Sequence, residues 1–258
     1  MDNPRTVARN PVSVCIITKD EEGNLPDCLA SVKWADDVVV VDSRSTDRTR
    51  EIASAAGARV IERDFPGHIE QKNFAVDQAK HDWVLCVDAD ERLTPALADA
   101  VRKALEAPAP FDGFELPRLT YHLGRPIRHG GWYPDRKVRL FDRRKGRWGG
   151  RNPHDHVEVK GRVGRLEGDL LHYSYRSISA HLRQIDFFTD IAAKEKRARG
   201  ERSSLGKMAL RPAWKFLRMF VLKAGFLDGV PGFIVAVSGA YYVFLKYAKL
   251  RELERADG

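Results

Sequence analysis

Asp88 and Asp90 stand two residues apart, directly after an apolar run. Side chains two apart in an extended segment point to the same side, so both carboxylates face one place. Convergent carboxylates form a hard oxygen site suited to Mg²⁺ or Mn²⁺, whose ligand shell a bound diphosphate can complete. A metal ion held there would offset the negative charge that builds on a departing nucleotide diphosphate.

Two further groups of polar side chains follow apolar runs in the same way. Residues 18–22, Thr-Lys-Asp-Glu-Glu, follow the first run, and Asp42 with Ser43 follows the second. Carboxylates in these places suit hydrogen bonds to a nucleobase and a ribose. A dinucleotide-binding fold would instead show a G-x-G-x-x-G turn after the first strand, which is missing here. Acids such as Asp20 and Asp47 could also serve only as helix caps.

The elements that must position these side chains alternate between strand and helix. Short β-branched apolar runs predict buried strands, and segments with helical spacing follow them. We expect strands at 12–18, 38–41, 59–62 and 83–87, and helices at 24–33, from Ser45 or Asp47 to Gly57, at 69–79, and from Thr94 to about 107. This α/β alternation predicts a mostly parallel sheet with helices on both faces, whose strands end at one ligand-binding edge.

Composition narrows the class of protein. The 258 residues, 43% of them hydrophobic, suffice for one large α/β domain and an appendage. A formal charge of +8 favours phosphate-bearing partners. Nucleic acid is the poorer candidate, because no binding module is visible and the basic residues interleave with apolar ones. Three dispersed cysteines, Cys15, Cys28 and Cys86, predict buried thiols in a reducing compartment. The polar N-terminus predicts a cytosolic protein without a secretory signal.

At this point the sequence resembles the family 2 glycosyltransferases with the GT-A fold. The matching segments are Val-Cys-Ile-Ile-Thr-Lys-Asp-Glu-Glu at 14–22, Val-Val-Asp-Ser-Arg-Ser-Thr-Asp at 40–47 and Val-Asp-Ala-Asp-Glu at 87–91. Segments 131–141 and 171–175 resemble a narrower branch, the lipopolysaccharide core-biosynthesis glucosyltransferases. The resemblance runs from about Val12 to Leu250. It implies a UDP-sugar donor and inversion at the anomeric carbon by direct displacement.

The resemblance also implies roles for individual residues on the donor side. Thr18, Asp20 or Glu21, and Asp42 would hold the nucleoside, with Ser43 beside them. Lys72 would lie near the donor sugar or the diphosphate. Asp88 would meet the phosphates, and Asp90 the metal ion. His172 stands where many GT-A enzymes place a third metal ligand, although a core histidine bonded to backbone is an equal alternative.

The general base, which removes the proton from the acceptor hydroxyl, has two candidates. Asp155 is favoured over Asp135 because relatives tend to show His-Glu where this sequence has His154-Asp155. Residues 112–175 are rich in Gly, Arg and aromatic side chains, and short alternating runs such as 137–141 predict small strands built onto the sheet. We expect the acceptor, a lipid-linked or phosphorylated saccharide, to bind in this region.

The C-terminal part suggests contact with a membrane. Ser177 can cap a long helix through 180–199. Beyond it, a basic stripe lies beside a broad apolar arc, as in helices that lie in a membrane interface. The stripe consists of Lys207, Arg211, Lys215 and Arg218. Residues 229–245 carry no charge, but seventeen residues fall short of a typical span, so this segment could embed, re-enter or pack in an oligomer.

These observations predict a GT-A type α/β fold with a C-terminal amphipathic, helical, membrane-associating extension. We expect a flexible N-terminus at 1–11, a nucleotide-sugar-binding half at 12–110, an acceptor-binding half at 111–176 and the helical region at 177–258. The expected protein is a peripheral enzyme on the inner face of the cytoplasmic membrane, and a homo-oligomer is possible. The alternatives are a nucleotidyltransferase of related architecture, against which the acidic loop at 20–22 counts, and a non-catalytic membrane-associated scaffold.

Overall fold

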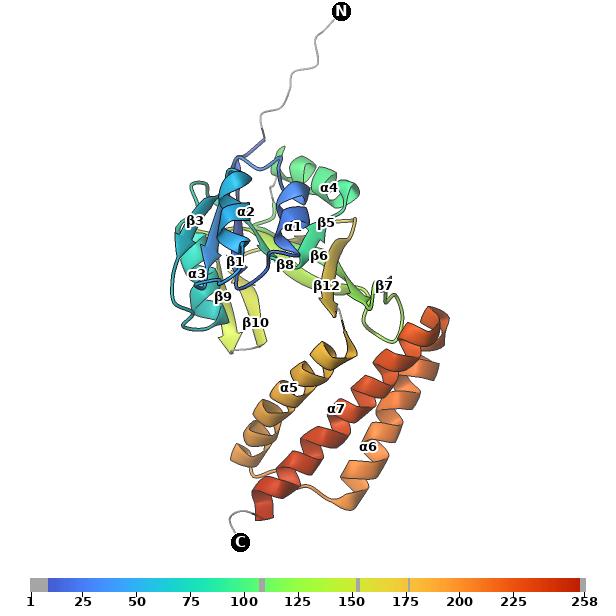
Figure 1. Ribbon diagram of the computed structural model, residues 1–258. Helices are drawn as coiled ribbons and strands as arrows, with labels where there is room; N and C mark the ends of the chain where they lie inside the picture. Colours follow the sequence, from blue (N-terminus) through green and yellow to red (C-terminus); the bar gives the residue numbers. More distant parts are fainter. Residues whose placement is uncertain (1–8, 107–109, 152–153, 176, 256–258) are drawn as a thin grey trace, which may run out of the picture. The chain divides into compact units, whose positions relative to one another are not determined.

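The computed structural model describes residues 9–106, 110–151, 154–175 and 177–255. Its first four strands are parallel and lie in the order β3-β2-β1-β4; β1 and β3 are labelled in Figure 1. These strands are β1 (Val12–Thr18), β2 (Asp37–Asp42), β3 (Arg59–Glu62) and β4 (Trp83–Asp88). In the register, Thr18 lies opposite Asp42 and Ile17 opposite Asp88. The acidic groups of β1, β2 and β4 therefore lie at one edge, as expected.

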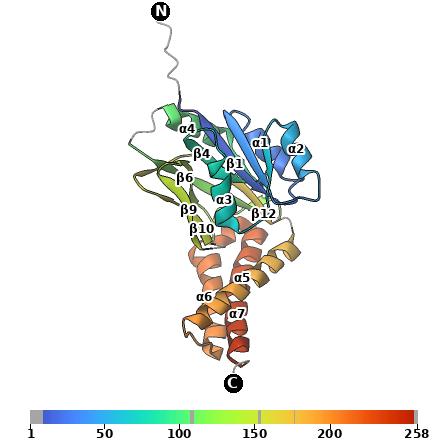
Figure 2. The same cartoon turned by 90° about the vertical axis from the view of Figure 1, so that its left-hand side faces the viewer.

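Helices cover both faces of this parallel part (Figure 2). They are α1 (Leu25–Ser31), α2 (Thr49–Ala55), α3 (His68–Asp77) and α4 (Pro95–Glu106). Apolar residues of α1, α2 and α4 pack on one face of the sheet, and those of α3 pack on the other. The α/β class with helices on both faces is confirmed, and the three cysteines are buried free thiols.

The sequence predicts side-chain caps for the N-termini of α2 and α4. The hydroxyl oxygen of Thr94 accepts the N–H of Leu97 at 3.3 Å, so the predicted cap of α4 is confirmed. Of the two caps predicted for α2, Ser45 is wrong, because the helix begins only at Thr49 and the Ser45 hydroxyl donates to Asp42. Asp47 lies two residues before the helix, and its carboxylate accepts the N–H of Thr49 at 3.0 Å, so it satisfies one donor of the first turn without being the N-cap residue.

Antiparallel strands extend the sheet beyond β4. They are β5 (Glu91–Leu93), β6 (Gly113–His122), β7 (Arg125–Pro126), β8 (Asp135–Asp142) and β12 (Leu170–Tyr175), while the short β11 (Val163–Arg165) runs parallel to β6. Strand β8 pairs with β4 on one side and with β6 on the other. A separate hairpin is formed by β9 (Gly146–Arg151) and β10 (His154–Val159). The small strands predicted between 112 and 175 are therefore present.

The C-terminal part is helical. It consists of α5 (Ile178–Ala198), α6 (Leu205–Leu217), a π-helical turn at Arg218–Leu222, a 3₁₀ turn at Gly225–Asp228 and α7 (Gly229–Arg255). The hydroxyl oxygen of Ser177 accepts the N–H of Ala180 at 3.1 Å, as its predicted capping role requires. Helix α7 packs against both α5 and α6. Gly232 permits a close backbone approach, because a Cβ there would lie 2.0 Å from the carbonyl oxygen of Gly225.

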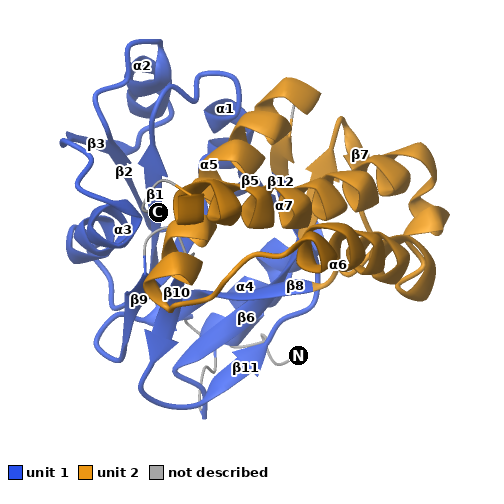
Figure 3. Ribbon diagram, turned by 90° about the horizontal axis from the view of Figure 1, so that it is seen from below, with its two compact units in different colours: residues 1–118, 135–172 blue, residues 119–134, 173–258 orange. Residues whose placement is uncertain are grey.

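The chain divides into two compact units (Figure 3). One unit comprises residues 1–118 and 135–172, and the other comprises 119–134 and 173–258. The parallel strands, helices α1 to α4 and the β9–β10 hairpin belong to the first unit, and helices α5 to α7 belong to the second. The functional boundaries expected from the sequence, at 110/111 and 176/177, stay predictions.

Asp37, at the start of β2, generates a prediction about stability and pH. It accepts hydrogen bonds from the Ser13 hydroxyl at 2.8 Å and from two nitrogens of Arg59 at 2.9 Å each. Burial opposes its ionisation, but these hydrogen bonds outweigh it and lower its pKa to about 2. An unfolded aspartate titrates at about 3.9, so the ionised form stabilises the fold above that pH. This contribution is lost as the pH falls towards the folded pKa.

We therefore expect Asp37→Asn to lower the free energy of unfolding at pH 7 and to flatten its decline between about pH 4 and pH 2. Urea denaturation across this range measures both effects. The matched control is Asp64→Asn, which removes an exposed ion pair with Arg44 and should change little. An unchanged slope in Asp37→Asn would contradict the assignment.

Candidate functional site

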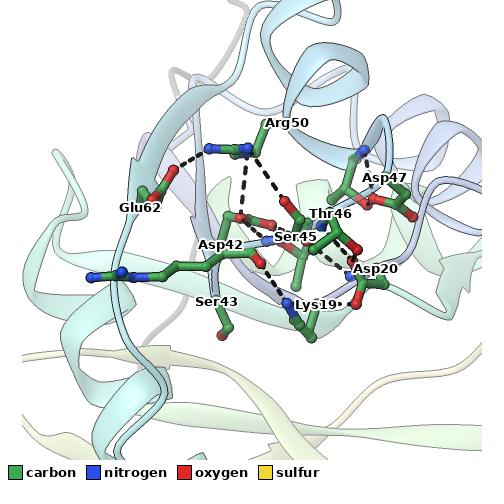
Figure 4. A network of polar contacts seen from close by, with 12 residues as sticks. Lys19, Asp20, Asp42, Ser43, Ser45, Thr46, Asp47, Arg50 and Glu62 are labelled. Atoms are coloured by element: carbon green, nitrogen blue, oxygen red, sulfur yellow. Dashed lines mark hydrogen bonds and ion pairs between the residues drawn. The ribbon is translucent and has the colours of Figure 1, made fainter.

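Asp20 and Asp42, two of the residues predicted to bind the nucleoside at the ends of β1 and β2, belong to one polar network with Ser45 (Figure 4). The hydroxyl of Thr18 donates to Asp42 at 2.9 Å, and the N–H of Ser45 donates to the other oxygen of Asp42 at 2.8 Å. Asp42 is fully buried. Its carboxylate thus fixes the loop that follows β2, and its direct contact with a nucleoside stays a prediction.

The acids after β1 are engaged with the same loop. Asp20 has a positive φ of 53° and accepts the N–H of Thr46 at 2.7 Å, a bond that lowers the pKa of its carboxyl. The N–H of Glu21 donates to the Thr49 hydroxyl at 2.8 Å, and the carboxylate of Glu21 accepts from Asn24 at 2.7 Å. Together these bonds tie the loop after β1 to the loop after β2. Ser43 beside them accepts from Gln71 at 3.2 Å and is half-buried.

A second polar centre lies at the end of β4. Lys72 of α3 places its ammonium 3.2 Å from Asp88 and 2.8 Å from Asp155 of β10. Its Nζ also lies 4.3 Å from the centre of the Trp148 ring. Three residues that are up to 83 positions apart in the chain are thus brought together. Their convergence joins a predicted donor-binding lysine, the first aspartate of the Asp-x-Asp pair and a candidate base.

Arg139 completes this centre, and the sequence reasoning missed it. Its guanidinium donates to Asp88 at 2.9 Å and to Glu91 at 2.8 Å. Glu91 is fully buried, and its other carboxylate oxygen accepts the N–H of Asp88 at 2.9 Å. The available signal was a charged residue inside an otherwise apolar run of β8, between Val138 and Leu140. Such a residue is buried only when it is paired.

The charges in this centre hold one another ionised. Burial opposes the ionisation of Asp88, but the charges of Lys72 and Arg139 lower its pKa far below the ordinary range. Burial also disfavours the charged form of Lys72, yet Asp88 keeps the pKa of Lys72 above its ordinary value. Burial disfavours the charged form of Arg139 as well, but the charges of Glu91 and Asp88 outweigh it and raise the pKa of Arg139. All of these groups are therefore charged at neutral pH.

A cavity of about 600 Å³ opens beside the charged centre. Lys72, Asp88, Arg139, Trp148 and Asp155 are among its lining residues. Asp155 therefore faces a space large enough for a saccharide unit.

The other candidate base, Asp135, has a different setting. It is held by Arg118 at 2.6 Å and by Lys137 at 3.2 Å. Its side chain is not among those that line the cavity within the described part of the chain. The geometry thus brings Asp155, rather than Asp135, to Asp88 and Lys72.

The predicted metal ligands form a pair. His172 Nε2 lies 3.3 Å from a carboxylate oxygen of Asp90, and both side chains are partly exposed. Across residues 9–255, outside the undescribed gaps, no cluster of three His, Cys, Asp or Glu side chains could hold an ion by itself. The carboxylate oxygen of Asp90 fits Mg²⁺ or Mn²⁺, whereas the imidazole nitrogen of His172 is a softer donor that fits Mn²⁺ better than Mg²⁺; a diphosphate and water would complete the shell.

Comparison with known proteins agrees with this picture. The model of glycosyl transferase family 2 matches residues 13–157. An uncharacterized glycosyltransferase of Rickettsia typhi is 32% identical, with 94% of this chain and 87% of that protein covered. The lipopolysaccharide core biosynthesis glycosyltransferase LpsC of Rhizobium meliloti is 30% identical, with 95% and 93% covered.

Among solved structures, glucosyl-3-phosphoglycerate synthase from Mycobacterium tuberculosis, crystallised with Mn²⁺, UDP and its product, aligns with a TM-score of 0.38 at 22% identity. The match covers 43% of this chain and 44% of that one.

The buried position of Arg139 predicts a large cost for its removal. Arg139→Met leaves Asp88 and Glu91 with one cation fewer, and breaking a buried pair costs about 3–5 kcal/mol of folding free energy. Arg147→Met is the matched control, because Arg147 pairs with Asp77 at the surface and such pairs contribute less than about 1 kcal/mol. Urea denaturation compares the two variants, and equal, small losses would refute the structural role of Arg139.

Proposed function

Because this chain belongs to glycosyl transferase family 2, we propose that it transfers a hexose from a UDP-sugar to a lipid-linked or lipopolysaccharide-core saccharide, with inversion at the anomeric carbon. It is a glycosyltransferase of the hexosyltransferase class with a GT-A type fold. The observation that carries the proposal is the convergence of Lys72, Asp88 and Asp155 beside one cavity. Family membership also removes the nucleotidyltransferase alternative.

The reaction proposed is a single displacement. The acceptor hydroxyl gives its proton to a carboxylate oxygen of Asp155, and its oxygen forms a bond to the anomeric carbon. The bond between that carbon and the diphosphate oxygen breaks, and its electron pair leaves with UDP. The products are an inverted glycoside and UDP, and the proton on Asp155 then returns to solvent.

Charge on the leaving diphosphate must be stabilised as the bond breaks. A divalent cation, Mg²⁺ or Mn²⁺, would be held by Asp90 and His172 and would supply positive charge against the departing diphosphate. Lys72 adds a second positive charge beside Asp88. Arg139 keeps Asp88 in place from the protein side, so that the carboxylate keeps its orientation while the donor binds.

The acceptor proposal rests on the cavity and on the relatives. The LpsC protein acts, by its name, in lipopolysaccharide core biosynthesis. The cavity beside Asp155 is lined by further cations, Arg118, Arg136 and Lys137, which suit a saccharide that bears phosphate or carboxylate groups. We therefore place the acceptor in this cavity, with its reacting hydroxyl at Asp155.

The base assignment gives a direct kinetic prediction. Asp155→Asn should lower kcat by roughly 10²- to 10⁴-fold, because a positioned base contributes about that factor. Asp135→Asn is the matched control and should keep activity within about tenfold, because Asp135 is already neutralised by Arg118 and Lys137. Transfer of labelled glucose from UDP-glucose to a membrane lipid extract measures both. A larger loss in Asp135→Asn would reverse the assignment.

The second unit supports a peripheral position on the cytoplasmic face of the membrane. Helices α6 and α7 and the turns between them expose many large apolar side chains, which is unusual for a soluble surface. They are Leu205, Leu210, Trp214, Leu217, Val221, Leu222, Phe226, Leu227, Val230, Phe233, Val237, Tyr241 and Phe244. By length and composition alone, residues 225–255 could even cross a membrane, and only 17% of their most apolar window is buried.

Cations accompany this apolar surface. Arg211 of α6 and Lys246 of α7 lie over the ring of Tyr247, at 5.2 and 5.5 Å. Burial lowers the pKa of Lys246, and the nearby charges of Lys196, Arg211 and Lys215 lower it further. Within the described residues, no carboxylate forms an ion pair with Arg211, Lys215 or Lys246. Anionic lipid head groups would relieve this repulsion, so apolar and electrostatic attraction favour the same surface.

This surface predicts vesicle binding that depends on its apolar side chains. The protein should sediment with phosphatidylglycerol-containing vesicles and less with pure phosphatidylcholine. Trp214→Ser should weaken binding by roughly tenfold, the effect of removing one large apolar side chain from the interface. Phe65→Ser, which changes an exposed aromatic residue of the other unit, should not. If the protein forms a homo-oligomer and binds no vesicles, the membrane proposal is contradicted. The apolar surface would then be a contact with a second copy of the chain.

A further inference from the structure

Lys72 is shared between two carboxylates with different proposed roles. Its ammonium is 2.8 Å from Asp155, the proposed base, and 3.2 Å from Asp88, the proposed donor-side acid. Only about a tenth of the Lys72 and Asp155 side chains is exposed. This contact therefore has little competition from water, and it is stronger than a surface ion pair.

The contact with Lys72 takes up one of the two carboxylate oxygens of Asp155. While the ammonium is bonded to Oδ2, it also holds the carboxylate in one orientation. Within the described residues, Lys72 is the only cation that forms an ion pair with Asp155. Release of the base therefore requires movement of Lys72 alone.

Asp88, in contrast, has a second cationic partner besides Lys72. Arg139 binds Asp88 at 2.9 Å and is itself locked to the buried Glu91. When Lys72 moves, Asp88 keeps a buried cation and its orientation. Lys72 can therefore move to another anion while Arg139 keeps its contacts with Asp88 and Glu91.

Resting on the proposed function, we propose that Lys72 is a positioning residue that frees both oxygens of the base only when the donor is bound. Without donor, Lys72 occupies Asp155. The diphosphate of the arriving donor attracts the ammonium towards the end of β4, and Asp155 is left as a free carboxylate that faces the cavity. Both oxygens of Asp155 are then free for the acceptor hydroxyl only after the donor is in the site, which favours binding of the donor first.

The proposal has a thermodynamic consequence that a purely structural Lys72 would not have. Donor binding must break the contact between Lys72 and Asp155, and the intrinsic affinity for the donor is reduced by that amount. Removing the competing carboxylate should therefore tighten donor binding, although the same change slows catalysis. The tightening should vanish when Lys72 is absent.

A double-mutant cycle tests this coupling. UDP is titrated calorimetrically, with Mg²⁺ present, into the wild-type protein, Asp155→Asn, Lys72→Met and the double variant. Asp155→Asn should bind UDP roughly three- to tenfold more tightly, the range typical of coupling between contacting residues. Lys72→Met should bind more weakly, and adding Asp155→Asn to it should change nothing further. Glu158→Gln, an exposed acid on the same strand, controls for simple loss of negative charge.

Trp148 provides a second readout, because the ammonium of Lys72 lies 4.3 Å from its ring centre. Saturating UDP should change the Trp148 emission, obtained as the difference between the wild-type protein and Trp148→Phe. The change should be absent in Lys72→Met at UDP concentrations that calorimetry shows to be saturating. A change that persists in Lys72→Met would mean that the donor, and not the lysine, alters the indole.

The outcomes separate this inference from the proposed function. No binding of UDP to the wild-type protein would overturn the proposed donor and the inference with it. If UDP binds and Asp155→Asn tightens its binding equally in the wild-type protein and in Lys72→Met, the inference alone is overturned. The tightening would then come from the loss of a negative charge and not from release of Lys72. Tightening that requires Lys72, with a Lys72-dependent emission change, supports the proposal.

Discussion

The buried contact of Arg139 with Asp88 and Glu91 is the constraint on which the site depends. A guanidinium that is 4% exposed must have carboxylate partners, and these partners must keep their charge. Because Arg139 lies on β8 and its partners lie at the end of β4 and the start of β5, the contact joins the antiparallel part of the sheet to the parallel part. Asp88 also contacts Lys72, and Lys72 in turn contacts Asp155. The polar centre is therefore a series of ion pairs that begins at the buried Arg139 and ends at Asp155.

Much of the fold could be predicted from the sequence, because β1, β2 and β4 are short, rich in β-branched residues and almost entirely buried. Parallel pairing then required that residues after β1, β2 and β4 meet at one edge, and the observed register puts Thr18 opposite Asp42. The buried state of the cysteines also agrees with expectation, and His172 lies beside Asp90, whereas the role of both as metal ligands stays a prediction. These features depend on local pattern and on the topology of a parallel sheet, both of which can be deduced from a single sequence.

Other features depend on contacts across long distances in the chain, which no local pattern records. The meeting of Lys72 with Asp155 joins α3 to a hairpin 83 residues later. The burial of Arg139 follows from its place on a strand that pairs with β4, whereas the sequence shows only an arginine between apolar neighbours. The full burial of Asp42 is a third example, because the loop that covers it is held by Ser45 and Thr18. In each case the side chain was visible in the sequence, but its partners were not.

We propose that the carboxyl ends of β1, β2 and β4 bind a uridine diphosphate together with a divalent cation at Asp90. Calorimetric titration of UDP into the purified protein, with and without Mn²⁺ and repeated on Asp90→Ala, measures this binding. We expect binding that requires the metal ion and is lost in the variant. Absence of UDP binding under every metal condition, or binding that is unchanged in Asp90→Ala, would contradict it.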